Sequence, residues 1–152
     1  MKPKLITAYM KTAEVFAELS HARRLHVGAI IVKDDRIISI GYNGMPAGWD
    51  NNCEMHPTVI DPETFEPVEN TDILVTRPEV LHAETNALAK LAKSTESGDG
   101  ASMFITHAPC LNCAKLIYQS GINKVWYRDS YRDTAGVQFL KNSNVQVIQT
   151  NE

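Results

Sequence analysis

The chain has 152 residues, of which 43% are hydrophobic and 22% charged, proportions typical of one globular domain with a substantial core. We therefore expect a single domain over residues 1–152. The 15 basic and 18 acidic residues give a net charge of −3, which argues against a nucleic-acid partner bound through its phosphate backbone. No apolar run is long enough to predict a transmembrane helix, and residues 1–8 lack the apolar region of a secretion signal. We expect no membrane association and a cytoplasmic location, in the host cytoplasm if the chain is viral.

The first half of the chain predicts a helix and a hairpin. Apolar residues at helical spacing over residues 4–19 predict a helix. The β-branched run 27–32, a polar turn and residues 36–42 predict a β-hairpin. No periodicity holds over residues 43–79, where five of the prolines lie. A loop of this length is usually functional, and the alternative is a disordered insertion.

The second half alternates helices and strands. The expected elements are a helix over 80–93, a strand over 102–106, a helix over 110–120 ended by Gly121, a strand over 123–128, a helix over 133–142 and a strand over 145–149. The core contacts expected from the helix over 80–93 are Leu81, Leu88, Leu91 and Ala92. This order predicts an α/β fold in which helices cover both faces of a mixed sheet.

The three cysteines indicate a metal site. Cys53, Cys110 and Cys113 form an odd set without a secretion signal, which argues against a disulfide framework. A redox Cys-x-x-Cys motif is expected after the first strand of a βαβ unit. The pair at Cys110 and Cys113 instead comes late and follows His82 and Glu84, and this spacing favours zinc over a redox role.

His82, Cys110 and Cys113 are the predicted zinc ligands. Catalytic zinc sites use three protein ligands and leave the fourth position to water. The two cysteines are three residues apart at a predicted helix start, so their sulfurs face the same way, and the helix dipole favours the thiolate form. Zinc in such a site makes water nucleophilic near neutral pH.

Glu84 is the predicted catalytic residue. It follows His82 by two positions and therefore lies on a different side of the helix, which favours a proton shuttle over a ligand. It would take a proton from the attacking water, deliver it to N3 of a pyrimidine and protonate the departing amino group. The alternative is an exposed glutamate in the first helical turn. His107 competes as a ligand but is expected to be structural or substrate-lining, and His21, His26 and His56 are likewise left out of the catalytic zinc site.

Three stretches, residues 41–48, 82–87 and 109–115, resemble the cytidine and deoxycytidylate deaminase superfamily, and more narrowly its deoxycytidylate (dCMP) branch. The resemblance implies a three-layer α/β/α sandwich with a mixed five-stranded sheet. It implies hydrolysis of dCMP to dUMP and ammonia with Zn²⁺ as cofactor, which supplies dUMP for dTMP synthesis. It also implies a homohexamer, activation by dCTP and inhibition by dTTP, with Mg²⁺ accompanying the effector.

The glycine-rich stretch is the expected nucleotide-binding region. Asn43 can donate and accept, which suits a deoxyribose hydroxyl of the substrate. Gly41, Gly44 and Gly48 allow positive φ and close approach of a ligand, and the resemblance implies that an allosteric nucleotide lies near these glycines and Asn43. The alternative is a glycine-rich turn after a strand.

A substrate monophosphate also needs cations. Arg23 and Arg24 precede the first predicted strand, and Tyr131 and Arg132 follow the fourth. Arginine forks match phosphate oxygens, so Arg24 and Arg132 are candidate substrate-binding residues. The resemblance implies that Tyr131 and Arg132 lie over the active site as a gate. The alternative for each arginine is a solvated surface charge.

Two further questions stay open on sequence alone. Some relatives carry a second, structural zinc, but here the early cysteine position is Ala22, and only Cys53 with nearby His56 remains. A second Zn²⁺ near Cys53 is the alternative to a small buried cysteine. For the reaction, the alternatives are a cytidine, dCTP or tRNA adenosine deaminase, or a non-catalytic zinc and nucleotide-binding module, which would need a fourth protein ligand.

Overall fold

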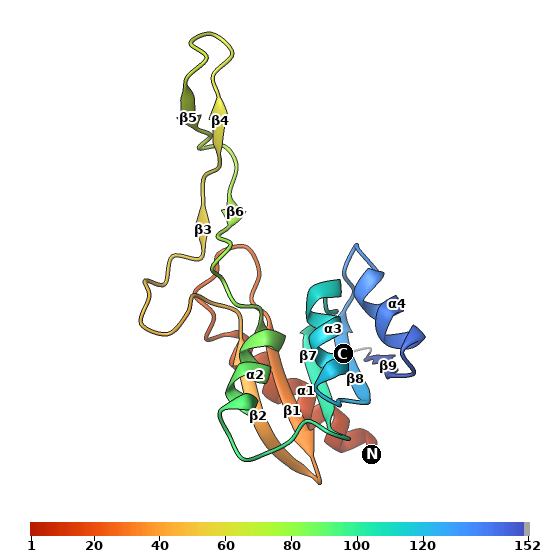
Figure 1. Ribbon diagram of the computed structural model, residues 1–152. Helices are drawn as coiled ribbons and strands as arrows, with labels where there is room; N and C mark the ends of the chain where they lie inside the picture. Colours follow the sequence, from red (N-terminus) through yellow and green to blue (C-terminus); the bar gives the residue numbers. More distant parts are fainter. Residues whose placement is uncertain (151–152) are drawn as a thin grey trace.

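A mixed five-stranded sheet with strand order β2-β1-β7-β8-β9 organises the computed structural model, which describes residues 1–150 (Figure 1). Its strands are β1 (Gly28–Lys33), β2 (Arg36–Tyr42), β7 (Ser102–His107), β8 (Lys124–Asp129) and β9 (Gln146–Gln149), and the helices are α1 (Pro3–Ala17), α2 (Ala83–Ala92), α3 (Leu111–Gln119) and α4 (Ala135–Asn142). Strand β1 pairs antiparallel with β2 and β7, whereas the β7–β8 and β8–β9 pairs are parallel. The predicted α/β class and mixed five-stranded sheet are confirmed.

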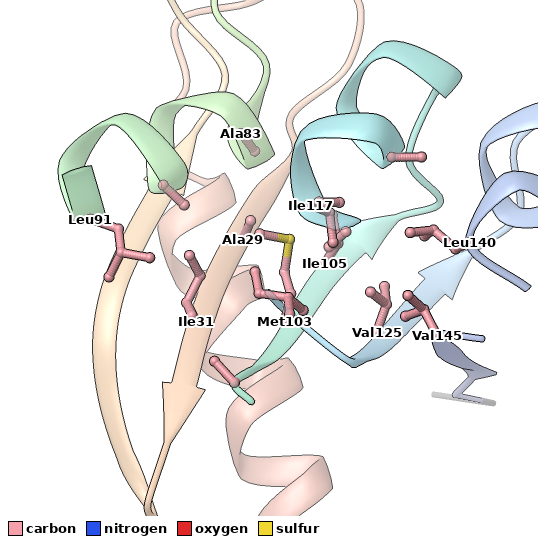
Figure 2. Packing of buried hydrophobic residues seen from close by; sticks show 14 residues of the cluster. Ala29, Ile31, Ala83, Leu91, Met103, Ile105, Ile117, Val125, Leu140 and Val145 are labelled. Carbon is pink, nitrogen blue, oxygen red and sulfur yellow. The ribbon is translucent and has the colours of Figure 1, made fainter. Parts of the chain in front are cut away.

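Alternating side chains of β1 build two cores on opposite faces of the sheet. Ile30 and Val32 pack with Met10 of α1 and Phe104 of β7. Ile31, with its neighbour Ala29, faces the other way into a larger core formed with α2, α3 and α4 (Figure 2). Because strand side chains alternate between faces, one strand supports both layers of helices. The result is the predicted three-layer α/β/α sandwich.

The predicted hairpin is confirmed, and its turn has a clear local cause. Asp34 and Asp35 both adopt positive φ, of 52° and 59°, as a two-residue turn between right-twisted strands requires. A bulge between Ile31 and Val32 shifts the β1–β2 register.

The helix expected over residues 80–93 begins later than predicted. Leu81 is extended and forms a β-bridge with Gly44, in which the Leu81 N–H donates to Gly44 O at 2.8 Å and the Gly44 N–H donates to Leu81 O at 3.1 Å. These long-range bonds keep Leu81 out of the helix, which starts at Ala83. Of the expected core contacts, Leu91 is buried and Leu88 packs on the core, whereas Ala92 is exposed and Leu81 only half-buried. The predictions for Leu81 and Ala92 were therefore wrong.

The segment expected to lack regular structure is an arm that stands away from the sheet (Figure 1). Strand β3 (Glu54–Met55) pairs with β6 (Val75–Thr76), and β4 (Thr58–Ile60) pairs with β5 (Pro67–Glu69). Neither an irregular loop nor a disordered insertion describes this arm. The prolines argued against strands in this segment. Pro67, however, occupies the first position of β5, where a missing N–H is tolerated. No side chain between residues 57 and 76 is buried.

No helix of residues 1–150 combines the length and apolar character needed to cross a membrane.

Candidate metal centre and nucleotide cavity

Two helix starts bring the predicted metal ligands together. His82 is the N-terminal cap of α2 and Cys110 that of α3, each with extended backbone. Cys113 lies one turn into α3 and is buried. Both helices pack on the same face of the sheet, as their shared core shows, so residues 28 and 31 positions apart in sequence become neighbours.

The three ligand atoms have the spacing of a metal site. His82 Nδ1 lies 3.2 Å from Cys113 Sγ and 3.6 Å from Cys110 Sγ, and the three atoms are all within 4.8 Å of one another. In a tetrahedral zinc site, with metal–ligand bonds of about 2.0–2.3 Å, ligand atoms lie roughly 3.5 Å apart. Two sulfurs and an imidazole are a donor set that suits zinc. The residues present therefore fit a zinc ion with a position left for water.

The electrostatics of the cluster favour a thiolate. Hydrogen bonds from Cys113 and then from His82 lower the pKa of Cys110 to about 4. The pKa of Cys113 moves upward, because it donates to Cys110 and is buried. The hydrogen bond between His82 and Cys110 raises the pKa of His82. Two adjacent sulfurs cannot both ionise unless a nearby cation offsets the repulsion between the two thiolates. A divalent metal ion bound between them would supply that charge.

Glu84 lies in the first turn of α2 and is only 4% exposed. The alternative of an exposed first-turn glutamate is therefore wrong. Burial raises the pKa of its carboxyl, against the opposing effects of Cys113 and His82. A raised pKa makes it easier for this carboxylate to take up a proton, which a general base requires.

A cavity of about 400 Å³ opens over the cluster, a size typical of small-molecule sites. Its lining includes His82, Glu84, Cys110, Arg24, Asn43, His107, Tyr131, Glu54 and Thr76. The structure thus brings the predicted residues Arg24, Asn43 and Tyr131 to the same cavity as the metal cluster. Arg132 is exposed and does not line this cavity.

Asn43 has a role that sequence analysis missed. Its Oδ1 accepts from the Val27 N–H at 2.8 Å, and its Nδ2 donates to Leu25 O at 2.8 Å. The side chain therefore fixes the segment that leads into β1. The sugar contact of Asn43 stays a prediction.

The three glycines near Asn43 differ from one another. Of the three, only Gly48 has positive φ, at 85°, and the nucleotide contact expected of all three stays a prediction. A Cβ at Gly41 would meet the backbone of Ala83 and Ala87, so the close packing of α2 requires a glycine at this position. Gly44 takes part in the bridge to Leu81, with open space where a Cβ would lie.

His107 and Tyr131 form an aromatic wall of the cavity. Their ring centroids are 5.3 Å apart at an interplanar angle of 67°. His107 is not part of the metal-ligand group. The lining role expected of His107 fits this position, whereas its alternative role as a ligand does not.

Cys53 and His56 each have a hydrogen-bond partner other than a metal ligand. The Cys53 thiol is 1% exposed and donates to Asn51 O at 3.6 Å, while His56 donates through Nδ1 to Ile73 O at 2.7 Å. Burial raises the pKa of Cys53, which keeps the thiol protonated. Within residues 1–150, His82, Cys110 and Cys113 are the one group of three or more side chains arranged to hold a metal. The expectations of a second Zn²⁺ near Cys53 and of Mg²⁺ with an effector are therefore unsupported.

Comparison with known proteins agrees with this geometry. Residues 3–128 match the family described as the cytidine and deoxycytidylate deaminase zinc-binding region. The chain belongs to this family of zinc-binding deaminases.

Three individual proteins illustrate what the chain is similar to. A crystal structure of dCMP deaminase from the cyanophage S-TIM5 in complex with dCMP and dUMP is 45% identical, with a TM-score of 0.85 and 99% of each chain covered. The deoxycytidylate deaminase of enterobacteria phage T4 is 36% identical over 149 aligned positions, gaps included, and the match covers 80% of this chain and 77% of that protein. ComE operon protein 2 of Bacillus subtilis (strain 168) is 35% identical over 124 residues, which cover 82% of this chain but 59% of that protein.

Proposed function

We propose that this chain catalyses the hydrolytic deamination of dCMP to dUMP and ammonia. The observation that carries the proposal is the joint placement of His82, Cys110 and Glu84 on one cavity, with Cys113 completing the ligand set beneath it. The similarity to a deaminase structure that contains dCMP and dUMP supports the choice of substrate.

In this proposal, His82, Cys110 and Cys113 would hold a zinc ion, whose Lewis acidity would make water nucleophilic near neutral pH. Glu84 accepts a proton from the water that attacks C4 of the base and gives it to N3. Glu84 then takes the remaining proton from the hydroxyl group now on C4 and passes it to the amino group, so that the C4–N bond breaks, the C4 carbonyl forms and ammonia leaves. Burial of Glu84 favours the uptake of the proton because it raises the pKa of the carboxyl.

The remaining lining residues would bind the nucleotide. The guanidinium of Arg24 would take the phosphate, since an arginine fork matches phosphate oxygens. Tyr131, held against His107, would close one side of the base site. Arg132 is proposed as part of the same gate, to be drawn towards the phosphate when substrate is present.

The direct test is turnover of dCMP by zinc-loaded protein, followed as the appearance of dUMP and compared with deoxycytidine and dCTP. Glu84→Gln should lower kcat by about 100-fold or more and leave the zinc content at the wild-type value. Absence of dCMP turnover, with or without dCTP, would refute the proposal. Loss of zinc from Glu84→Gln would instead make Glu84 a ligand.

We also propose, from the family resemblance, a homohexamer that dCTP activates and dTTP inhibits through Gly41, Asn43, Gly44 and Gly48. Sedimentation velocity would measure the assembly state. Saturation curves for dCMP with each triphosphate would measure regulation, and curves that neither nucleotide moves would refute it.

A further inference from the structure

Glu54 is a buried carboxylate with no part in the chemistry described so far. It lies in β3, at the root of the arm, and is 2% exposed. It also lines the cavity that holds Glu84 and the metal cluster. A buried acidic side chain beside a nucleotide cavity needs an explanation, because an unpaired charge there would be unfavourable and would repel a phosphate.

Its carboxylate binds two consecutive residues of the segment between α1 and β1. Glu54 Oε1 accepts from the Arg23 N–H at 2.6 Å and from the Arg24 N–H at 3.1 Å. Glu54 Oε2 accepts from Arg23 Nε at 3.3 Å. Both oxygens therefore have donors, and two backbone bonds and one side-chain bond fix this segment to the arm's root.

The same contacts separate the two adjacent arginines. The guanidinium of Arg23 is held by Glu54 Oε2 and by Asn52 Oδ1, at 3.0 Å from the latter. The guanidinium of Arg24 has no hydrogen bond or ion pair with the described part of the chain, and Arg24 lines the cavity. One arginine thus neutralises the buried carboxylate, and its neighbour keeps its charge for a ligand.

We propose that Glu54 is a positioning residue for the phosphate end of the substrate. Glu54 binds the backbone N–H groups of Arg23 and Arg24 and the side chain of Arg23. These contacts orient the segment so that the guanidinium of Arg24 faces the nucleotide phosphate. The inference rests on the proposed function, because a substrate without a phosphate makes no use of Arg24. It makes the preference for a nucleotide over a nucleoside depend on a residue that need not touch the substrate.

Glu54→Gln tests the inference with little change of shape. The amide nitrogen of glutamine cannot accept a hydrogen bond, so at least one of the three contacts is lost. We expect kcat/KM for dCMP to fall by about tenfold, the equivalent of about 1.4 kcal/mol, mainly through KM. We expect kcat/KM for deoxycytidine and the zinc content to stay within about twofold of wild type. Glu96→Gln is the matched control, since Glu96 pairs with Arg36 at 3.1 Å outside the cavity.

A double-mutant cycle shows whether Glu54 acts through Arg24. Arg24→Gln should lower kcat/KM for dCMP but not for deoxycytidine. Adding Glu54→Gln to this variant should have little further effect, because the effects of coupled residues are not additive. Additive losses, or equal losses on dCMP and deoxycytidine, would overturn the inference and leave Glu54 a structural residue.

The experiment separates this inference from the proposed function. If the wild-type chain prefers dCMP and Glu54→Gln keeps that preference, the positioning role fails alone. If the wild-type chain turns over dCMP and deoxycytidine equally well, the positioning role fails although dCMP deamination stands. If it does not turn over dCMP at all, the proposed function fails and the inference fails with it.

Discussion

A methyl group added to α4 should disturb the proposed metal site, although α4 supplies no ligand. Gly136 is buried in the first turn of α4. A Cβ there would lie 2.7 Å from the carbonyl carbon of Cys110 and 2.8 Å from its oxygen, and closer still to the carbonyl oxygen of Pro109. These are backbone atoms, so the contact cannot be relieved by a side-chain rotation.

The magnitude follows from two opposing effects. Alanine is favoured over glycine in a helix by at most about 1 kcal/mol, whereas overpacking of this kind costs about 1–3 kcal/mol. Gly136→Ala should therefore destabilise the fold, and Tm should fall by about 2–4 °C for each kcal/mol. Bringing the closest of these contacts to 3.0 Å requires α4 and the Cys110 segment to separate by roughly 0.8 Å, whereas metal–ligand distances tolerate about 0.2 Å. We expect zinc affinity to fall by about tenfold or more, as for other changes in the support of ligands.

Chelator competition and thermal unfolding would measure the two effects, and the chain offers two matched controls. Gly44→Ala meets no atom within 4 Å, so it should change stability by no more than about 0.5 kcal/mol. Gly28→Ala would press on the backbone of Ala13 and Ala17 in α1, so it should lower Tm without changing zinc affinity. Wild-type zinc affinity in Gly136→Ala would refute the reasoning.

Three further outcomes are expected. Cys113→Ser should lose zinc and, with it, activity, because two ligands remain of the three; metal analysis of the purified variant checks this, and full zinc occupancy would contradict it. Burial raises the pKa of Glu54, but hydrogen bonds from Arg23 and Arg24 outweigh it and lower the pKa overall. Its stabilising effect is therefore complete above the unfolded pKa of about 4.3 and is lost as the pH falls through the lower folded value. Glu54→Gln should then cost about 1–3 kcal/mol at pH 7, with a gap to wild type in urea midpoints that narrows below about pH 4; a gap independent of pH would be the wrong result. Replacing residues 58–69 with a short glycine-serine turn should keep the zinc content and leave Tm within about 3 °C, because none of these side chains is buried, and a chain that no longer folds would contradict this.

The metal cluster was predictable from sequence because its signal is local. Cys110 and Cys113 share one helical turn, and His82 and Glu84 share another, so spacing alone defines their relative directions. The hairpin at Asp34 and Asp35 was predictable for the same reason. Periodicity and turn chemistry act over a few residues, and these features need no more.

Features built from distant residues were not predictable in this way. The contact of Glu54 with Arg23 joins positions 31 residues apart, and no local pattern marks it. Leu81 left its expected helix because Gly44 pairs with it, and Gly41 is a glycine because α2 passes over it. In each case a tertiary contact overrides or replaces the local preference.

The position of the metal ligands at two helix starts also couples cofactor supply to folding. His82 and Cys110 are 28 residues apart, so an ion bound between them cross-links α2 to α3 and is bound tightly only by the folded chain. Mass action then adds about 2.7 kcal/mol to the free energy of unfolding when free zinc is 100 times its dissociation constant. When zinc is scarce, a larger fraction of the chain is therefore unfolded and open to proteases.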